Sequence, residues 1–162
     1  VFEAARILNE MRTALSGEKY LTFNPGLILG GTTVDQQMVL GSATGKSNVV
    51  AARVFVSGDI RYISRQQEES TRQRMREIVA KSLPGTKATI SFQDGIPAME
   101  PTEANYALLR QLDQVSRDLG FGAVEALDPG QRGAGDIAFI SEIIPGLDGI
   151  GIGGGENSHA RG

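Results

Sequence analysis

Several residue types are scarce or missing in this 162-residue sequence, and each absence narrows what the protein can do. It has no cysteine, which excludes disulfides, zinc ribbons and thiol nucleophiles but does not fix a compartment. It has no excess of positive charge, and the net charge of −3 argues against a protein that binds nucleic acid through its phosphates. It also lacks any run near the roughly 18 apolar residues of a membrane span. We therefore expect neither nucleic acid nor a membrane as a partner.

Periodic segments are clear, and the composition is that of a globular protein. Hydrophobic residues make up 40% of the chain and charged residues 22%, so a core can be buried. Apolar residues at helical spacing predict helices over residues 1–16, 64–83 and 102–119. Apolar and alternating segments predict strands over residues 20–31, 48–63 and 87–93. The polar stretch at residues 32–46 predicts a loop.

Local signals add detail to these elements. Ser64 with Gln67 three residues further on is a capping-box pattern, which predicts the start of a helix. Pro25 and Gly26 inside a predicted strand indicate an edge or a bulge. Gly58 indicates a bulge or a close approach of two backbones.

The first part of the chain predicts an incomplete module. Residues 1–93 run helix, strand, strand, helix, strand, which is one strand short of a βαββαβ arrangement. The missing strand would precede Val1, which opens directly onto a helical pattern. Residues 158–162 stop in polar, loop-like sequence. We therefore expect this chain to be a stretch cut from a longer one.

Two prolines and a glycine after residue 93 predict a domain boundary. We expect a first domain over residues 1–95 and a second over residues 96–162. In the second domain, short strands at residues 123–126 and 147–152 flank a short helix at residues 136–143. Helices alternating with strands are typical of a parallel α/β sheet, although these strands are too few to close one alone. The expected fold class is α/β.

The only histidine, His159, is one candidate for chemistry. Imidazole binds zinc well, and His159 follows a glycine-rich run after a short apolar strand, where ligands of α/β sheets collect. A surface residue or a hydrogen-bonded filler is the plainer interpretation of a lone histidine. The glycine-rich run at residues 149–155 could also hold a phosphate. However, no amphipathic helix follows it, and no Lys-Ser or Lys-Thr pair completes a P-loop.

Arg61 and Asp136 are further candidates. Arg61 lies two residues after Asp59 on the polar face of its strand, and its fork of donors suits a substrate carboxylate. A surface ion pair with Asp59 is the alternative. Asp136 follows two glycines and suits a helix N-cap, and it could also bind a metal.

Six motifs, in this order, resemble the glutamate carboxypeptidase branch of the two-zinc aminoacylase and carboxypeptidase family. The likeness covers essentially the whole chain. The motifs are Glu3-Ala4-Ala5, Gly30-Gly31-Thr32, Gly45-Lys46-Ser47-Asn48-Val49-Val50, Gly58-Asp59-Ile60-Arg61, Arg132-Gly133-Ala134-Gly135-Asp136 and Gly153-Gly154-Gly155-Glu156-Asn157-Ser158-His159.

The resemblance implies a catalytic α/β domain with an inserted βαββαβ, ferredoxin-like lid that pairs subunits in many members. Residues 1–95 then correspond to the lid without its first strand, and residues 96–162 to the C-terminal part of the mixed-sheet catalytic domain. Arg61 is similar to the lid arginine that holds the substrate carboxylate. Asn48 is similar to a lid asparagine near the substrate, and His159 to a metal-binding histidine.

The chemistry implied by the resemblance is cleavage of an amide bond next to a free carboxylate, in a small peptide or an N-acyl amino acid. Two zinc ions would polarise the carbonyl and activate a bridging water. A second copy of the chain, bound through the lid, is the implied partner. The family's other metal ligands have no counterpart here, so we expect no catalytic residue in this stretch and no activity from the isolated chain. A dimerisation or binding module without catalysis, and a nucleotide-binding α/β protein, are the competing hypotheses.

Overall fold

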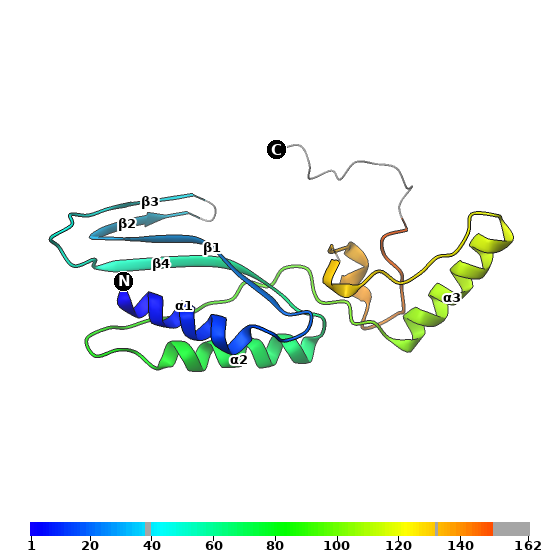
Figure 1. Cartoon of the computed structure of the whole chain (residues 1–162), viewed down its shortest axis with the longest axis horizontal. Coiled ribbons are helices and arrows are strands. Elements are labelled where there is room, and N and C mark those ends of the chain that lie inside the picture. Colours follow the sequence, from blue (N-terminus) through cyan, green and yellow to red (C-terminus); the bar gives the residue numbers. More distant parts are fainter. Residues whose placement is uncertain (38–39, 132, 151–162) are drawn as a thin grey trace. The chain divides into compact units, whose positions relative to one another are not determined.

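The computed structural model describes residues 1–37, 40–131 and 133–150. The chain divides into two compact units, one of Val1–Asp94 and one that begins at Gly95 (Figure 1). The elements of the first unit are α1 (Phe2–Leu15), β1 (Thr22–Gly31), β2 (Thr33–Gln36), β3 (Gly41–Thr44), β4 (Arg53–Arg61) and α2 (Arg65–Ala80). Those of the second are α3 (Glu103–Asp118) and the 3-10 helices η1 (Pro129–Gln131) and η2 (Asp136–Ile140).

Helices α1 and α2 form where the helical spacing of apolar residues predicts them. The backbone leaves α1 through Gly17, whose φ of 86° is left-handed and favours glycine. At the start of α2, Ser64 Oγ accepts a hydrogen bond from the Gln67 N–H at 3.2 Å. Gln67 Oε1 in turn accepts one from the Ile63 N–H at 3.0 Å. The predicted helix cap at Ser64 is therefore confirmed.

The core of the first unit is built on α1 and α2. Its buried side chains are Met11, Leu15, Met75, Ile78 and Val79. Half-buried apolar residues that pack against them from other segments are Leu21, Phe23, Ile60, Ala88, Ile90 and Phe92. Apolar surface contributes about 25 cal/mol per Å² removed from water, so this cluster holds the helices, the sheet and the segment after α2 together.

Strands β1 and β4 pair antiparallel along their length. The register shifts between Pro25 and Leu27, which confirms the bulge predicted at Pro25 and Gly26. Gly58 lies opposite Pro25, and a side chain at Gly58 would meet the carbonyl oxygen of Asn24. The predicted close approach of two backbones at Gly58 is therefore confirmed as well.

The loop prediction for residues 32–46 is wrong, because β2 and β3 pair there as an antiparallel hairpin. All four residues of β3 are exposed, and only Val34 of β2 is half-buried. The segment therefore lacks the alternation of apolar and polar residues that marks a half-buried strand. The Thr32 N–H donates to the Thr44 carbonyl at 2.8 Å, which joins the hairpin to the end of β1.

Two strand predictions are corrected by the backbone. The strand predicted over residues 48–63 covers only Arg53–Arg61, because residues 47–48 form a turn. Residues 87–93 form no strand, because no strand in the described ranges pairs with them. Their side chains nevertheless alternate between half-buried and exposed. A strand needs a hydrogen-bonded neighbour, which a sequence pattern alone does not supply.

In the second unit, α3 confirms the helix predicted at residues 102–119. Thr102 Oγ1 caps it by accepting a hydrogen bond from the Asn105 N–H at 3.2 Å. Two short strands were expected here, but residues 123–126 and 147–150 are not strands, so the parallel sheet is absent from the described part of this unit. A parallel strand forms only beside other strands, and the described part of this unit contains none. Helix α3 therefore has no sheet to pack against there, and none of its residues is buried.

The short helix predicted at residues 136–143 is a 3-10 helix that ends at Ile140. Gly135 occupies its N-cap position, and no side chain caps it. The N-cap role predicted for Asp136 is therefore wrong, because Asp136 is already the first residue of η2. None of the helices in the described ranges is long and apolar enough to cross a bilayer.

Candidate functional site

Arg61 is the last residue of β4, opposite Thr22 of β1. Its Nε donates a hydrogen bond to Asp59 Oδ2 at 3.0 Å, and the two side chains are 61% and 62% exposed. The surface ion pair weighed as the alternative role of Arg61 is thus present in the structure. In the described part of the chain, the two terminal nitrogens of Arg61 make no hydrogen bond. They remain available to a carboxylate, which binds a guanidinium through two parallel hydrogen bonds.

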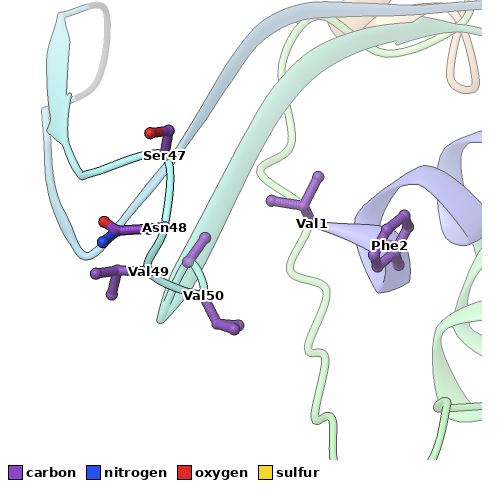
Figure 2. A pocket seen from close by; sticks show the side chains of 7 residues that line it. Val1, Phe2, Ser47, Asn48, Val49 and Val50 are labelled. Atoms are coloured by element: carbon purple, nitrogen blue, oxygen red, sulfur yellow. The ribbon is translucent and has the colours of Figure 1, made fainter.

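Asn48 lies at the other end of β4, in the turn that precedes it. It lines an open pocket of about 370 Å³ together with Val1, Phe2, Ser47, Val49, Val50 and Ala51. Figure 2 shows the Asn48 amide directed away from Val1 and Phe2, which line the other side of the pocket. The pocket wall is therefore mainly apolar.

The structure does not bring Arg61 and Asn48 together within one copy of the chain. Strand β4 separates them, and its nine residues span about 26 Å at roughly 3.3 Å per residue. A small amino-acid-like ligand that contacts Arg61 is therefore out of reach of Asn48 in the same copy. The single strand predicted over residues 48–63 already implies this separation, because thirteen positions are far apart along an extended chain.

The structure says little about the other residues that the sequence indicates as candidates for chemistry. His159 lies outside the described residues, and so does Arg132. Asp136 is exposed at the start of η2. Across residues 1–37, 40–131 and 133–150, no three side chains of His, Cys, Asp or Glu come together in a way that could hold a metal ion. The described residues therefore do not form a zinc site.

Two groups of charged residues join segments of the first unit. Glu3 is buried, and its Oε2 accepts a hydrogen bond from the Leu83 N–H at 3.0 Å. Its Oε1 pairs with Arg6 at 2.6 Å, and Arg6 also donates to the Ile78 carbonyl at 3.2 Å. The hydrogen bond from Arg6 holds the pKa of Glu3 below its usual range. These groups fix α1 against the end of α2 and do not face the pocket.

A second group of charged residues joins α1 and α2 at the other end of these helices. Glu18 pairs with Arg74 of α2 and accepts a hydrogen bond from Gln67 Nε2 at 3.0 Å. The hydrogen bond from Arg74 lowers the pKa of Glu18. Both groups of charged residues therefore serve the packing of α1 on α2.

Comparison with known families places the first unit. Residues 1–87 match the family model described as the peptidase dimerisation domain. The chain belongs to this family. The match runs from α1 through α2 and stops where the extended residues 87–93 begin. No curated protein and no solved structure gives a significant match to the chain.

Membership of the peptidase dimerisation domain family gives the first unit a role. The domain is part of a peptidase, and it suggests that two copies of the chain associate. The helices and small antiparallel sheets of Val1–Asp94 are compatible with an α/β dimerisation domain. The resemblance to a peptidase family that the motifs indicate is confirmed at this level.

Proposed function

We propose that the peptidase to which this dimerisation domain belongs is a zinc-dependent amidohydrolase of the carboxypeptidase or aminoacylase type. Its substrate is a small peptide or an N-acyl amino acid with a free carboxylate. Residues 1–95 are its lid, a βαββαβ module without the first strand, and residues 96–162 are the C-terminal part of its catalytic domain. The match of residues 1–87 to the peptidase dimerisation domain carries this proposal.

Arg61 is the proposed anchor for the substrate carboxylate. It stands exposed at the end of β4, and Asp59 uses only its Nε. A cation with free, planar donors on a lid positions a carboxylate and releases it when the lid opens. Asn48 contacts the same substrate as Arg61 only if the ligand is long enough to span β4, or if a second copy of the chain places its own Asn48 beside the ligand.

Zinc and His159 belong to the proposal through the family resemblance. When bound, zinc supplies Lewis-acid activation of the amide carbonyl and of a water. His159 supplies one imidazole ligand, and the other ligands are no part of this chain. We expect the purified 162-residue chain to hydrolyse no N-acyl amino acid in the presence of added zinc, and measurable turnover would contradict this.

Nuclear magnetic resonance of the 162-residue chain tests the carboxylate anchor. The Arg61 Nε–H resonance should shift on titration with an N-acetyl amino acid and should not shift with the corresponding carboxamide, which lacks the charge. Arg53, exposed at the other end of the same strand, is the matched control and should not respond to either. Equal shifts with the acid and the amide, or none at Arg61, would remove the assignment.

The second candidate function is a dimerisation module that carries out no chemistry. It is favoured by the absence of a metal-ligand cluster from the described residues and by a family match confined to the dimerisation domain. Sedimentation measures association in either case, since a dimer has twice the 17.2 kDa of one chain. A dimer in which the Arg61 Nε–H resonance does not shift with the carboxylate would support a dimerisation module without catalysis.

A further inference from the structure

The end of the β1–β4 strand pair that carries Arg61 presents four polar side chains on one face of the sheet. Thr22 of β1 lies directly opposite Arg61, and Asn24 lies directly opposite Asp59. Residues that face each other across paired strands, and residues two apart along one strand, point to the same side. These four side chains therefore form one group, which we call the polar patch.

The polar patch lies on the face of the sheet away from the core. Phe23 and Ile60 are paired between the two rows of the patch, and they pack against the core cluster of α1 and α2 on the opposite face (Figure 1). All four residues of the patch are exposed. A small dissolved molecule can therefore reach each of these side chains.

The patch has unused hydrogen-bonding groups of both charges. The one contact between Asp59 and Arg61 joins Asp59 Oδ2 to Arg61 Nε at 3.0 Å. Among the residues that the structure describes, Asp59 Oδ1 and the two Nη atoms of Arg61 make no hydrogen bond. The side chains of Thr22 and Asn24 make none there either. The ion pair thus offers an acceptor and a pair of donors side by side, with neutral polar groups across the strand.

The charge of Asp59 decides which ligand suits Arg61. A carboxylate bound to the Nη atoms of Arg61 lies close to the Asp59 carboxylate, and like charges at that range repel each other. An ammonium group on the same ligand turns the repulsion into an attraction. In an α-amino acid the ammonium nitrogen and the carboxylate carbon are about 2.5 Å apart. This separation is similar to the 3.0 Å contact that joins Asp59 and Arg61.

We propose that the polar patch binds a zwitterionic α-amino acid. The ligand carboxylate accepts hydrogen bonds from the Nη atoms of Arg61, and its ammonium group donates one to Asp59 Oδ1. Asn24 and Thr22 offer further hydrogen bonds from the neighbouring strand. The inference rests on the carboxylate anchor of the proposed function and adds Asp59 as the residue that distinguishes one ligand from another.

The proposed reaction produces this class of ligand. Water cleaves the amide bond, and the released amino acid carries a free amino group that is protonated at neutral pH. The N-acyl substrate has an uncharged amide nitrogen at the same position. The polar patch therefore binds the released amino acid more tightly than the N-acyl substrate, so that the free amino acid acts as an inhibitor at this site.

Titration of the 162-residue chain with L-alanine and with N-acetyl-L-alanine tests the proposal. Nuclear magnetic resonance follows the Arg61 Nε–H and the side-chain amide of Asn24. Exposed charges contribute modestly, so we expect L-alanine to bind about three- to fivefold more tightly than N-acetyl-L-alanine. Arg53, at the other end of β4, should respond to neither. Equal affinities, or tighter binding of the N-acetyl compound, would overturn the zwitterion site.

Variants of Asp59 assign the preference to its charge. Asp59→Asn should bring the ratio of the two affinities close to one, whereas Asp59→Glu keeps the charge and should keep a preference for L-alanine. Asp35→Asn removes the same charge from an exposed position on β2 and is the matched control, which should leave the ratio unchanged. A preference that survives in Asp59→Asn, or that is lost in Asp35→Asn as well, would contradict the role of Asp59.

The zwitterion site and the carboxylate anchor fail in different ways. Binding of both ligands at Arg61 without a preference would overturn the zwitterion site and leave the anchor in place. Binding of L-alanine without any response to N-acetyl-L-alanine would support the zwitterion site and overturn the N-acyl substrate of the proposed function. A chain that responds to neither compound would overturn both.

Discussion

The carboxylate of Glu3 accepts a hydrogen bond from the backbone N–H of Leu83 at 3.0 Å, which ties the first turn of α1 to the segment after α2. The same carboxylate pairs with Arg6, one turn further along α1. The chain that leaves α2 is therefore held at the start of α1, where residues 87–93 begin.

The Glu3 contact predicts a pH-dependent stability. The hydrogen bond from Arg6 lowers the pKa of Glu3 from its ordinary value of 4.5 in the folded chain, and the unfolded chain has the ordinary value. The stabilisation is therefore complete above pH 4.5 and is lost as the pH falls through the folded pKa. We expect Glu3→Gln to lower the unfolding temperature at pH 7 and to differ less from the native chain at pH 3. Glu69→Gln, an exposed change on α2, is the control and should differ little at either pH.

The core cluster predicts a large loss from one truncation. Met75 is 3% exposed and lies at the centre of the α1–α2 packing, so Met75→Ala should cost about 3 kcal/mol of unfolding free energy. Leu119→Ala removes a side chain that is 64% exposed and should change stability by less than about 0.5 kcal/mol. Urea unfolding followed by circular dichroism measures both. Equal effects would contradict the placement of the core.

The cap of α2 predicts opposite signs for two serine changes. Ser64→Ala removes the acceptor for the Gln67 N–H and should cost about 1 kcal/mol. Ser70→Ala, at an exposed position inside the same helix, should be neutral or stabilising by up to about 0.5 kcal/mol, because alanine is the better helix former. Thermal unfolding of the two variants decides this. A loss at Ser70 as large as at Ser64 would argue against the cap.

The close approach at Gly58 predicts a position-specific glycine effect. Gly58→Ala places a methyl group against the Asn24 carbonyl in the paired strand, so backbone must move, at a cost of about 1–3 kcal/mol. Gly95→Ala meets no atom within 4 Å and should be neutral or stabilising by up to about 1 kcal/mol. Denaturant midpoints of the two variants provide the comparison, and a tolerated Gly58→Ala would contradict the observed register of β1 and β4.

Elements whose cause is local could be predicted from the sequence. The stripe of Met11 and Leu15, the cap at Ser64 and the bulge at Pro25 each depend on neighbours a few residues away, and the structure confirms them. The hairpin of β2 and β3 could not be predicted, because its exposed residues carry no alternation. The burial of Glu3 could not be predicted either, because its partner Leu83 is eighty positions away in the sequence.

By itself, the sequence determined three helices with apolar stripes, a bulge at Pro25 and a close backbone approach at Gly58. These follow from side-chain periodicity, capping groups and glycine placement, all of which act within one or two turns of chain. Only the tertiary structure decided that β2 and β3 pair as a hairpin and that residues 87–93 have no partner strand among the described residues. Strand pairing and separation through space depend on backbone hydrogen bonds between distant segments, and no local pattern encodes those bonds.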